Sequence, residues 1–432
     1  MNTAHKMNRR GFVGACGAAG AAVLAGGCAS GGSGSNMGKV VVVGGGFGGA
    51  TAAKYLRLWS DNRIDVTLVE PNRAFVSCPI SNLVLGGSKQ IGDITVPYTN
   101  LASRHGVKVI HDMVASIDPA KKTVRLAGGD TLPYDRLVVC PGIDFMWDTV
   151  KDLQAANQAG RILQAWKAGP ETVALRRQLE AMPDGGVYAL AIPEAPYRCP
   201  PGPYERASVI ASYFKQAKPK SKVLVLDANA DVTSKGPLFK KVWTEQYKGI
   251  LEYRPQHKAI GVDGRTNAVK FEVNDDVKAD VLNVLPAMRA GSIAQQTGLA
   301  NVNARWCAVN YMTYESMVHP GIHVIGDSIQ LAPLMPKSGH MANQQAKVVA
   351  AAIVEIQAGR APHTQPVVMN TCYSFVDAKS AIHVASIHQY NVEQKTMLTV
   401  PGSGGVSAGG ATELEGNYAM AWAANIWADM LA

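Results

Sequence analysis

The feature that most constrains the fold of this chain is a glycine-rich turn that directly follows a run of β-branched residues. The run Lys39–Val43 predicts a buried parallel strand, and Ala50–Leu58 predicts a helix. Between them, Gly44, Gly46 and Gly49 have the G-x-G-x-x-G spacing. The first glycine permits a tight turn, the second lets a pyrophosphate approach the backbone, and the third allows close contact between helix and strand. The sequence therefore predicts a Rossmann-like α/β unit with a dinucleotide at the helix N-terminus.

The next predicted strand, Asp65–Val69, ends in an acidic residue that fits the same interpretation. Glu70 follows this strand, about 20 residues after Gly49. A carboxylate in this position can accept hydrogen bonds from the hydroxyl pair of a ribose, and it repels a 2′-phosphate. Because a glycine motif alone is weak evidence, the second strand and its carboxylate are what favour a nucleotide site.

Two later segments favour FAD over NAD as that nucleotide. Pro141 and Gly142 end a predicted strand in a turn similar to the one that returns the chain to the FAD domain in two-nucleotide flavoenzymes. Asp327 follows another predicted strand, and an aspartate in this position meets the ribityl chain of FAD, a group that NAD lacks. The helix predicted over Met341–Ile356 would direct its positive end, together with Lys337, at the negative charge of a reduced flavin.

Residues 151–292 repeat the β-α-β pattern without a phosphate-binding turn. Strands are predicted over 186–192 and 222–227, but the segment after the first of them, Pro193–Pro203, is rich in proline. Prolines remove backbone donors, and the bulky side chains of this segment prevent the close approach that a pyrophosphate needs. We therefore expect a second Rossmann-like domain that does not bind NAD(P)H and that carries Cys199 in a stiff bend.

The composition excludes global disorder and argues against nucleic acid as a partner. The 432 residues are 47% hydrophobic and 17% charged, enough to bury the cores of two or three domains. The formal net charge of +9 suits an anionic substrate or an acidic protein partner. Since no run of Lys and Arg is interleaved with aromatic residues, we expect no nucleic-acid binding. We also expect no metal site.

The N-terminal residues predict an export signal. Arg9 and Arg10 precede a short, weakly apolar stretch of glycine and alanine, as in a twin-arginine signal. Because that route carries folded proteins, we expect a cofactor-loaded protein in the periplasm. Cys28 lies in an imperfect lipoprotein cleavage box, so a lipid anchor at Cys28 and simple cleavage both stay open, with the Gly/Ser tract 29–36 as a tether.

The cysteines are too sparse for a disulfide scaffold and are interpreted one by one. Seven occur in 432 residues. Cys199 and Cys372 are each explained either as a small buried hydrophobe or, in an oxidising envelope, as half of a disulfide, and the residues alone do not establish a pairing. Cys140, beside the Pro-Gly turn, is expected to be a structural thiol, and no role is predicted for Cys307.

Four motifs resemble the flavin-binding subunit of flavocytochrome c sulfide dehydrogenase. They are Cys78–Asn82, Arg198–Ser208, Met335–Gly339 and Asn370–Ser374. The resemblance covers nearly the whole chain from Lys39 onwards. It implies two Rossmann-like, FAD/NAD(P)-binding-type domains and a C-terminal interface domain. The domains expected are 1–36 (signal and tether), 37–150 with 293–363 (FAD), 151–292 (second Rossmann-like) and 364–432 (interface).

The same resemblance implies a cofactor linkage, a mechanism and a partner. In that family, the cysteine matching Cys78 carries FAD through an 8α-thioether, and those matching Cys199 and Cys372 form a redox disulfide beside the flavin. Sulfide would attack this disulfide, leaving a persulfide and a thiolate, and the thiolate of Cys372 would pass two electrons to the flavin. Because the chain has no C-x-x-C-H haem motif, the acceptor would be a separate c-type cytochrome subunit.

Three alternatives stay beside this interpretation. A sulfide:quinone oxidoreductase shares the fold and would need an apolar, membrane-facing surface, for which the aromatic segment 417–427 is the candidate. An NADH-dependent disulfide reductase is disfavoured by the proline-rich segment 193–203. A non-catalytic flavoprotein that only handles sulfur is disfavoured by the joint presence of Cys78, Cys199 and Cys372.

Overall fold

The structure is a computed structural model that describes residues 35–432. The predicted twin-arginine signal and Cys28 lie outside the described residues. Met37–Ala432 form one compact unit, and the following description concerns this unit alone.

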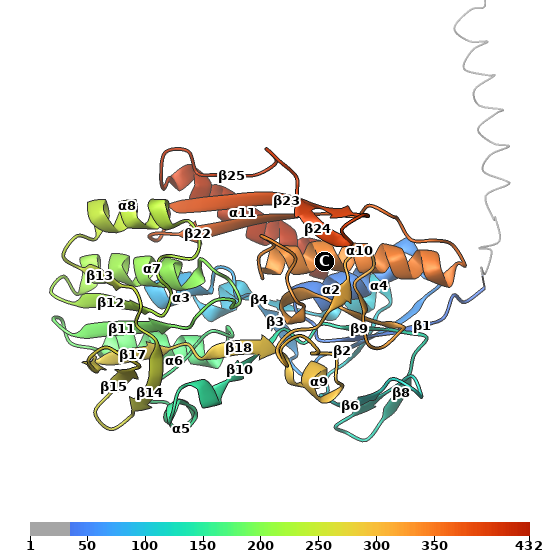
Figure 1. The fold of residues 1–432 in the computed structure, drawn as a ribbon, viewed down its shortest axis with the longest axis horizontal. Helices are drawn as coiled ribbons and strands as arrows, with labels where there is room; N and C mark the ends of the chain where they lie inside the picture. Colours follow the sequence, from blue (N-terminus) through green and yellow to red (C-terminus); the bar gives the residue numbers. More distant parts are fainter. Residues whose placement is uncertain (1–34) are drawn as a thin grey trace, which may run out of the picture. The chain divides into compact units, whose positions relative to one another are not determined.

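The first parallel sheet is built on the predicted strand–glycine–helix unit. Its seven strands are ordered β19-β20-β21-β9-β1-β2-β5. They are β19 (Val309–Asn310), β20 (Glu315–Ser316), β21 (Ile322–Val324), β9 (Arg136–Val139), β1 (Lys39–Val43), β2 (Asp65–Val69) and β5 (Lys108–Ile110). The five strands from β21 to β5 are parallel, and the valines of β1 are buried between β2 and β9. Helices α2 (Phe47–Trp59) and α10 (Gly339–Gln357) pack against each other beside this sheet (Figure 1).

The second parallel sheet has four strands in the order β13-β12-β11-β17. They are β13 (Leu251–Arg254), β12 (Lys222–Asp227), β11 (Val187–Ile192) and β17 (Val281–Val284). Helix α7 (Gly202–Ala217) packs on this sheet and on α8 (Gly236–Gln246). Two strands, β10 (Ile143–Met146) and β18 (Ala287–Ala290), pair in the connections between the two sheets. The α/β class predicted from the sequence is confirmed.

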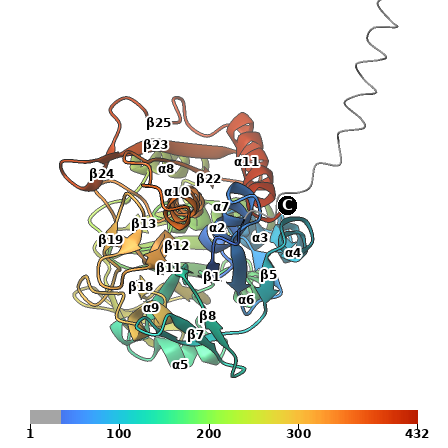
Figure 2. The same ribbon diagram turned by 90° about the vertical axis from the view of Figure 1, so that its right-hand side faces the viewer.

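The C-terminal residues form an antiparallel sheet that reaches both parallel-sheet units. Its strands are β22 (Val367–Phe375), β23 (Ala381–Asn391), β24 (Thr396–Thr399) and β25 (Gly405–Val406). Strand β22 packs against both α10 and α7, and helix α11 (Glu413–Leu431) packs against α2 and β23. Figures 1 and 2 both show β22, β23 and α11 together on one side of this unit. In residues 35–432, no helix is long and apolar enough to cross a membrane.

Shorter elements complete the described chain. They are β3 (Ala74–Val76), α3 (Ser81–Gly86), η1 (Ile91–Ile94), β4 (Thr95–Pro97), α4 (Thr99–His105), β6 (Val114–Asp118), β7 (Thr123–Leu126), β8 (Thr131–Pro133), η2 (Trp147–Thr149), α5 (Leu153–Gln158), α6 (Pro170–Ala181), β14 (Ala259–Asp263), β15 (Ala268–Phe271), β16 (Val277–Lys278), α9 (Ser292–Gln296) and η3 (Gly326–Ser328).

Candidate active site

A cavity of about 580 Å³ is lined by segments of both parallel-sheet units and of the C-terminal sheet. This volume lies in the range of cofactor and ligand sites. Most of the residues predicted for the site line it: Gly44, Gly46, Glu70, Cys78, Pro141, Gly142, Cys199, Asp327 and Cys372. Gly49 and Lys337 do not line it, for different reasons.

The glycine turn between β1 and α2 has the geometry that its three glycines permit. Gly44 has a φ of +92°, and a Cβ there would lie 2.4 Å from the carbonyl oxygen of Cys140. A Cβ on Gly49 would lie 1.7 Å from the carbonyl oxygen of Gly44, which places Gly49 in the helix–strand contact and away from the cavity. A Cβ on Gly46 would meet no atom within 4 Å, so the backbone is open to a ligand there.

The carboxylate of Glu70 is buried at the end of β2 and is held by three donors. One oxygen accepts a hydrogen bond of 2.7 Å from the backbone N–H of Gly45. The other accepts from the backbone N–H and the side-chain amide of Asn72, at 2.8 and 2.6 Å. Since Glu70 also lines the cavity, its remaining acceptor capacity faces the space where a ribose would lie.

Asp327 faces the same cavity beside the Pro141–Gly142 turn. The hydroxyl of Ser328 donates to the carbonyl oxygen of Gly142 at 2.5 Å, which joins the two predicted segments. Oδ1 of Asp327 is buried and has no hydrogen-bond partner among the described residues. Burial raises the pKa of this carboxyl, although Arg198 and Lys337 oppose the shift. A buried acceptor of this kind is costly unless a ligand donates to it.

Lys337 does not take the position expected of it. Its ammonium donates to the carbonyl oxygens of Asp327 and Ile329, at 2.9 and 2.6 Å, and lies 3.6 Å from the ring centroid of Trp306. Burial lowers its pKa to about 7. Lys337 therefore holds the backbone of the Asp327 segment through these two hydrogen bonds and does not line the cavity.

Two of the cations that line the cavity, Arg198 and Lys167, are beside Cys78. The sulfur of Cys78 lies 3.9 Å from the carbonyl oxygen of Trp166, and the guanidinium of Arg198 donates to the same carbonyl oxygen. Lys167, which follows Trp166 in the chain, also lines the cavity. Burial opposes the charge of Arg198, but the neighbouring Cys78, Asp327 and Cys199 raise its pKa above the ordinary value. This side of the cavity is therefore positively charged.

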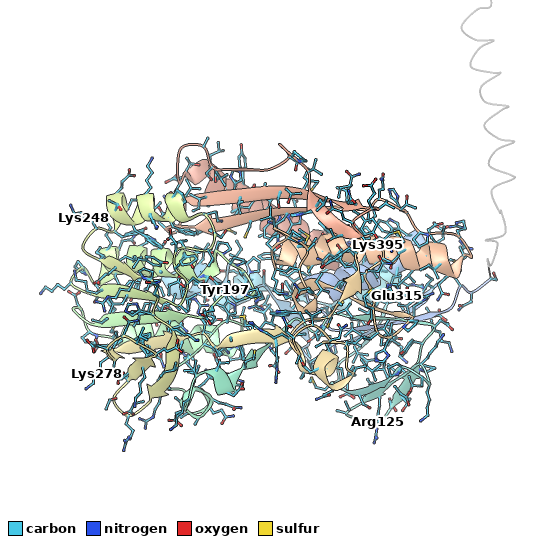
Figure 3. The ribbon with its side chains drawn as sticks, in the orientation of Figure 1. Arg125, Tyr197, Lys248, Lys278, Glu315 and Lys395 are labelled. Atoms are coloured by element: carbon cyan, nitrogen blue, oxygen red, sulfur yellow. The ribbon has the colours of Figure 1, made fainter. Side chains whose placement is uncertain are left out.

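Cys199 and Cys372 come from distant segments of the chain and meet as a hydrogen-bonded pair of thiols. Cys199 lies in the proline-rich loop that Tyr197 marks in Figure 3, with a φ of +57° that few side chains tolerate. Its N–H donates to the carbonyl oxygen of Lys337 at 2.9 Å, and Cys372 lies on β22. The hydrogen bond from Cys199 is the main cause that lowers the pKa of Cys372 to about 6, and it raises the pKa of Cys199.

Two charged residues near this pair were not predicted from the sequence. Glu205 lies in the first turn of α7, lines the cavity, and accepts a hydrogen bond of 3.1 Å from the N–H of Phe375. Burial raises its pKa to about 7. Its position six residues after Cys199 is a signal that could have been used. Lys235, before α8, donates to the carbonyl oxygen of Cys372 at 2.8 Å, and its sequence context carries no comparable signal.

The residues around the cavity fit FAD. Besides Asp327, the Nε of Arg198 and the indole N–H of Trp166 are buried without a partner among the described residues, and both residues line the cavity. Unpaired donors and an unpaired acceptor on one cavity suit a ligand with polar groups of both kinds. The open backbone at Gly46 and the carboxylate of Glu70 suit the pyrophosphate and ribose of its nucleotide half.

Comparison with family models assigns three parts of the chain. Residues 38–169 match pyridine nucleotide-disulphide oxidoreductase. Residues 172–286 match the central part of the sulfide dehydrogenase (flavocytochrome c) flavoprotein chain, and residues 364–431 match the flavin-binding model of flavocytochrome c sulphide dehydrogenase. These matches confirm FAD as the cofactor.

Individual proteins agree with these models. The flavoprotein chain of sulfide dehydrogenase (flavocytochrome c) from Chlorobaculum thiosulfatiphilum is 70% identical over 46 residues, which are 94% of that sequence and 11% of this chain. The mitochondrial sulfide:quinone oxidoreductase of Dictyostelium discoideum is 25% identical over 306 residues, which cover 68% of this chain. The chain spans 66% of the length of that relative.

A solved structure supports the fold independently. The sulfide:quinone oxidoreductase of Aquifex aeolicus superposes with a TM-score of 0.75 over 91% of both chains, at 18% identity. The two Rossmann-like domains predicted from the sequence are thereby confirmed. The family models and the 70% identical relative also confirm the predicted resemblance: the chain belongs to the flavocytochrome c sulfide dehydrogenase flavoprotein family.

Proposed function

We propose that this chain is the flavoprotein subunit of a sulfide dehydrogenase, an oxidoreductase that oxidises sulfide to sulfur or polysulfide. The electrons pass through the Cys199–Cys372 pair and FAD to a c-type cytochrome subunit. The observation that carries the proposal is the meeting of these two cysteines, from distant segments, in the cavity that also holds Glu70, Cys78 and Asp327. A structural role for either cysteine would not require this shared location.

The chemistry of the pair follows from thiol–disulfide exchange. In the oxidised pair, hydrosulfide attacks one sulfur, and the other sulfur leaves as a thiolate. The positive side of the cavity, with Arg198 and Lys167, favours entry of an anion. FAD, when bound, supplies an acceptor for the electron pair and releases the electrons singly.

The attachment of FAD is proposed to be covalent, through Cys78. This residue lines the cavity shortly before α3, and its neighbours Arg198 and Lys167 are both cations. Pro79 does not disturb this arrangement, since its carbonyl oxygen accepts a hydrogen bond of 2.8 Å from Ser77.

A direct role for NAD(P)H is not part of the proposal. In a dinucleotide site, the acidic residue after the second strand would be free for a ribose. The corresponding Asp227, the last residue of β12, is fully buried. Its oxygens accept from Tyr204 and Tyr253, at 2.7 and 3.0 Å, and from Asn229 at 2.7 and 2.9 Å. This occupied carboxylate supports a second domain without a nucleotide.

The division of the chain and its location complete the proposal. The FAD domain comprises 37–150 and 293–363, the second Rossmann-like domain 151–292, and the C-terminal interface domain 364–432. Residues 1–36 are proposed as a twin-arginine signal and tether, which places the protein in the periplasm, with lipidation or simple cleavage at Cys28.

Sulfide:quinone oxidoreductase is the second candidate function, because proteins of that name match most of the chain in sequence and fold. Both candidates share the cysteine chemistry and differ in the electron acceptor. The test is to reduce the purified protein anaerobically with sulfide and to offer oxidised cytochrome c or a soluble quinone. Rapid reduction of cytochrome c alone supports the proposal, and rapid reduction of quinone alone supports the second candidate.

The role of the cysteine pair has its own test. In Cys372→Ser, sulfide should no longer bleach the flavin, while the FAD content stays normal because Glu70 and Asp327 are intact. Retained bleaching by sulfide would instead favour a flavoprotein in which the pair has no catalytic role.

A further inference from the structure

Lys235 places a buried positive charge next to Cys372. The residue precedes α8 and is 8% exposed. Its ammonium donates to the carbonyl oxygen of Cys372 at 2.8 Å and to the hydroxyl of Ser374 at 2.7 Å. Both partners belong to β22 and both are neutral. In residues 35–432, no acidic side chain forms an ion pair with Lys235 within 4.0 Å, so this charge lacks the direct partner that a buried cation usually has.

The groups that face Lys235 indicate what balances its charge. Burial lowers the pKa of Lys235, and the groups that oppose this shift are Cys372, Glu205, Cys199 and Glu415, in decreasing order of influence. Glu205 has a pKa raised to about 7, so it is only partly ionised near neutral pH. Glu415 accepts a hydrogen bond from Ser407 and lies 3.0 Å from the ring nitrogen of His383, so it has partners of its own. The hydrogen bond with Cys372 and burial raise the pKa of Cys199, so the sulfur of Cys372 is the remaining group that can carry a full negative charge beside Lys235.

We propose that Lys235 is the positioning residue that makes Cys372, and not Cys199, the sulfur that leaves as a thiolate when an anionic sulfur nucleophile opens the pair. The inference rests on the proposed function for the identity of that nucleophile. The new bond forms between the nucleophile and Sγ of Cys199, the Cys199–Cys372 bond breaks, and its electron pair goes to Sγ of Cys372. No proton is transferred in this step, and the sulfur with the more stable thiolate leaves faster.

The two sulfurs differ in the way this proposal requires. Lys235 holds the backbone and the neighbouring side chain of the strand that carries Cys372. The cation that lowers the pKa of Cys199 is Arg198, which also interacts with Cys78 and Asp327. The arrangement therefore stabilises negative charge at Cys372 and leaves Cys199 as the position for a persulfide.

The test compares Lys235→Gln with Lys235→Arg in the full-length protein with its FAD. Gln keeps a hydrogen-bond donor and removes the charge, whereas Arg keeps both. The control is Lys241→Met, because Lys241 is an exposed lysine of α8, the helix that Lys235 precedes. Each protein is reduced anaerobically with dithiothreitol, freed of it by gel filtration, and treated with iodoacetamide between pH 5 and 9. Peptide mass spectrometry then gives the rate at each cysteine.

In the wild type, Cys372 should be alkylated before Cys199, with a midpoint near its pKa of about 6. Lys235→Gln should raise that midpoint by about one unit or more, and lower the rate at pH 5 about tenfold. Lys235→Arg and Lys241→Met should behave like the wild type. If Lys235→Gln does not retain FAD, Lys235→Met provides the charge-free variant.

An unchanged midpoint and order of alkylation in the charge-free variant would overturn the inference, as would faster alkylation of Cys199 in the wild type. The measurement uses no sulfide, so it separates this inference from the proposed function. A flavin that sulfide does not reduce would reject the function, and Lys235-dependent alkylation would still support the role of Lys235.

Discussion

The contact between Gly49 and Gly44 predicts a severe effect of adding one methyl group. In Gly49→Ala, the new Cβ would lie 1.7 Å from the carbonyl oxygen of Gly44. Because side chains do not approach backbone oxygen closer than about 3 Å, α2 has to move by about 1.3 Å away from β1. Such overpacking costs about 3 kcal/mol.

This displacement affects both stability and the cofactor. At roughly 2–4 °C per kcal/mol for a domain of about 150–250 residues, Tm should fall by about 6–12 °C. The moved helix also withdraws its N-terminal N–H groups from the cavity, so the bound FAD per protein should fall. Thermal unfolding followed by far-UV circular dichroism and the ratio of flavin to protein absorbance measure the two effects.

Gly46→Ala is the matched control, because a Cβ there meets no protein atom within 4 Å. It should leave the far-UV spectrum unchanged and lower the FAD content, since the added methyl group occupies ligand space. A Gly49→Ala protein with wild-type Tm and full FAD would refute the reasoning, because it would show that the helix–strand contact is not tight.

Three further predictions concern the linkage, the buried carboxyl and the C-terminal helix. Cys78→Ser should release FAD into the supernatant after acid precipitation, whereas the wild type keeps it on the protein; release from both would reject the thioether. Burial raises the pKa of Glu205 to about 7, so its contribution to stability is full below the unfolded pKa and is lost as pH rises towards 7. Glu205→Gln should therefore gain on the order of 2 kcal/mol relative to the wild type between pH 4.5 and 7.5 in urea unfolding, and a constant difference would contradict this. In Gly416→Ala, the Cβ would lie 1.6 Å from the carbonyl oxygen of Lys379, whereas a Cβ on Gly409 meets nothing within 4 Å. Gly416→Ala should lower Tm and Gly409→Ala should not. Equal Tm values for the two variants would show that α11 shifts to accept the methyl group without loss of stability.

The parts of the site that depend on local pattern could be predicted from the sequence. β1, β2 and β12 have the predicted bounds, and α10 is only slightly longer than predicted, at Gly339–Gln357. Valine runs, glycine spacing and the capping serine before α10 act over a few residues, so their signals survive without tertiary information.

The parts that depend on distant contacts could not be predicted from the residue pattern, and the pairing of Cys199 with Cys372 was implied only by the family resemblance. The β22–β23 hairpin carries Cys372 to Cys199 from the other end of the chain, and a segment of alternating polarity does not reveal its partner. The ammonium of Lys337 is captured by two backbone carbonyl groups, although its position in the sequence suggested the cavity. Lys235 becomes important only because α8 begins beside β22.

The measurement that tests the central claim most directly is an anaerobic titration of the purified protein with sulfide, followed by flavin absorbance, with oxidised cytochrome c added afterwards. The account predicts bleaching by nearly stoichiometric sulfide and then reduction of the cytochrome as the flavin recovers. A flavin that does not respond to sulfide would contradict the account, because the Cys199–Cys372 pair would then not connect sulfide to FAD.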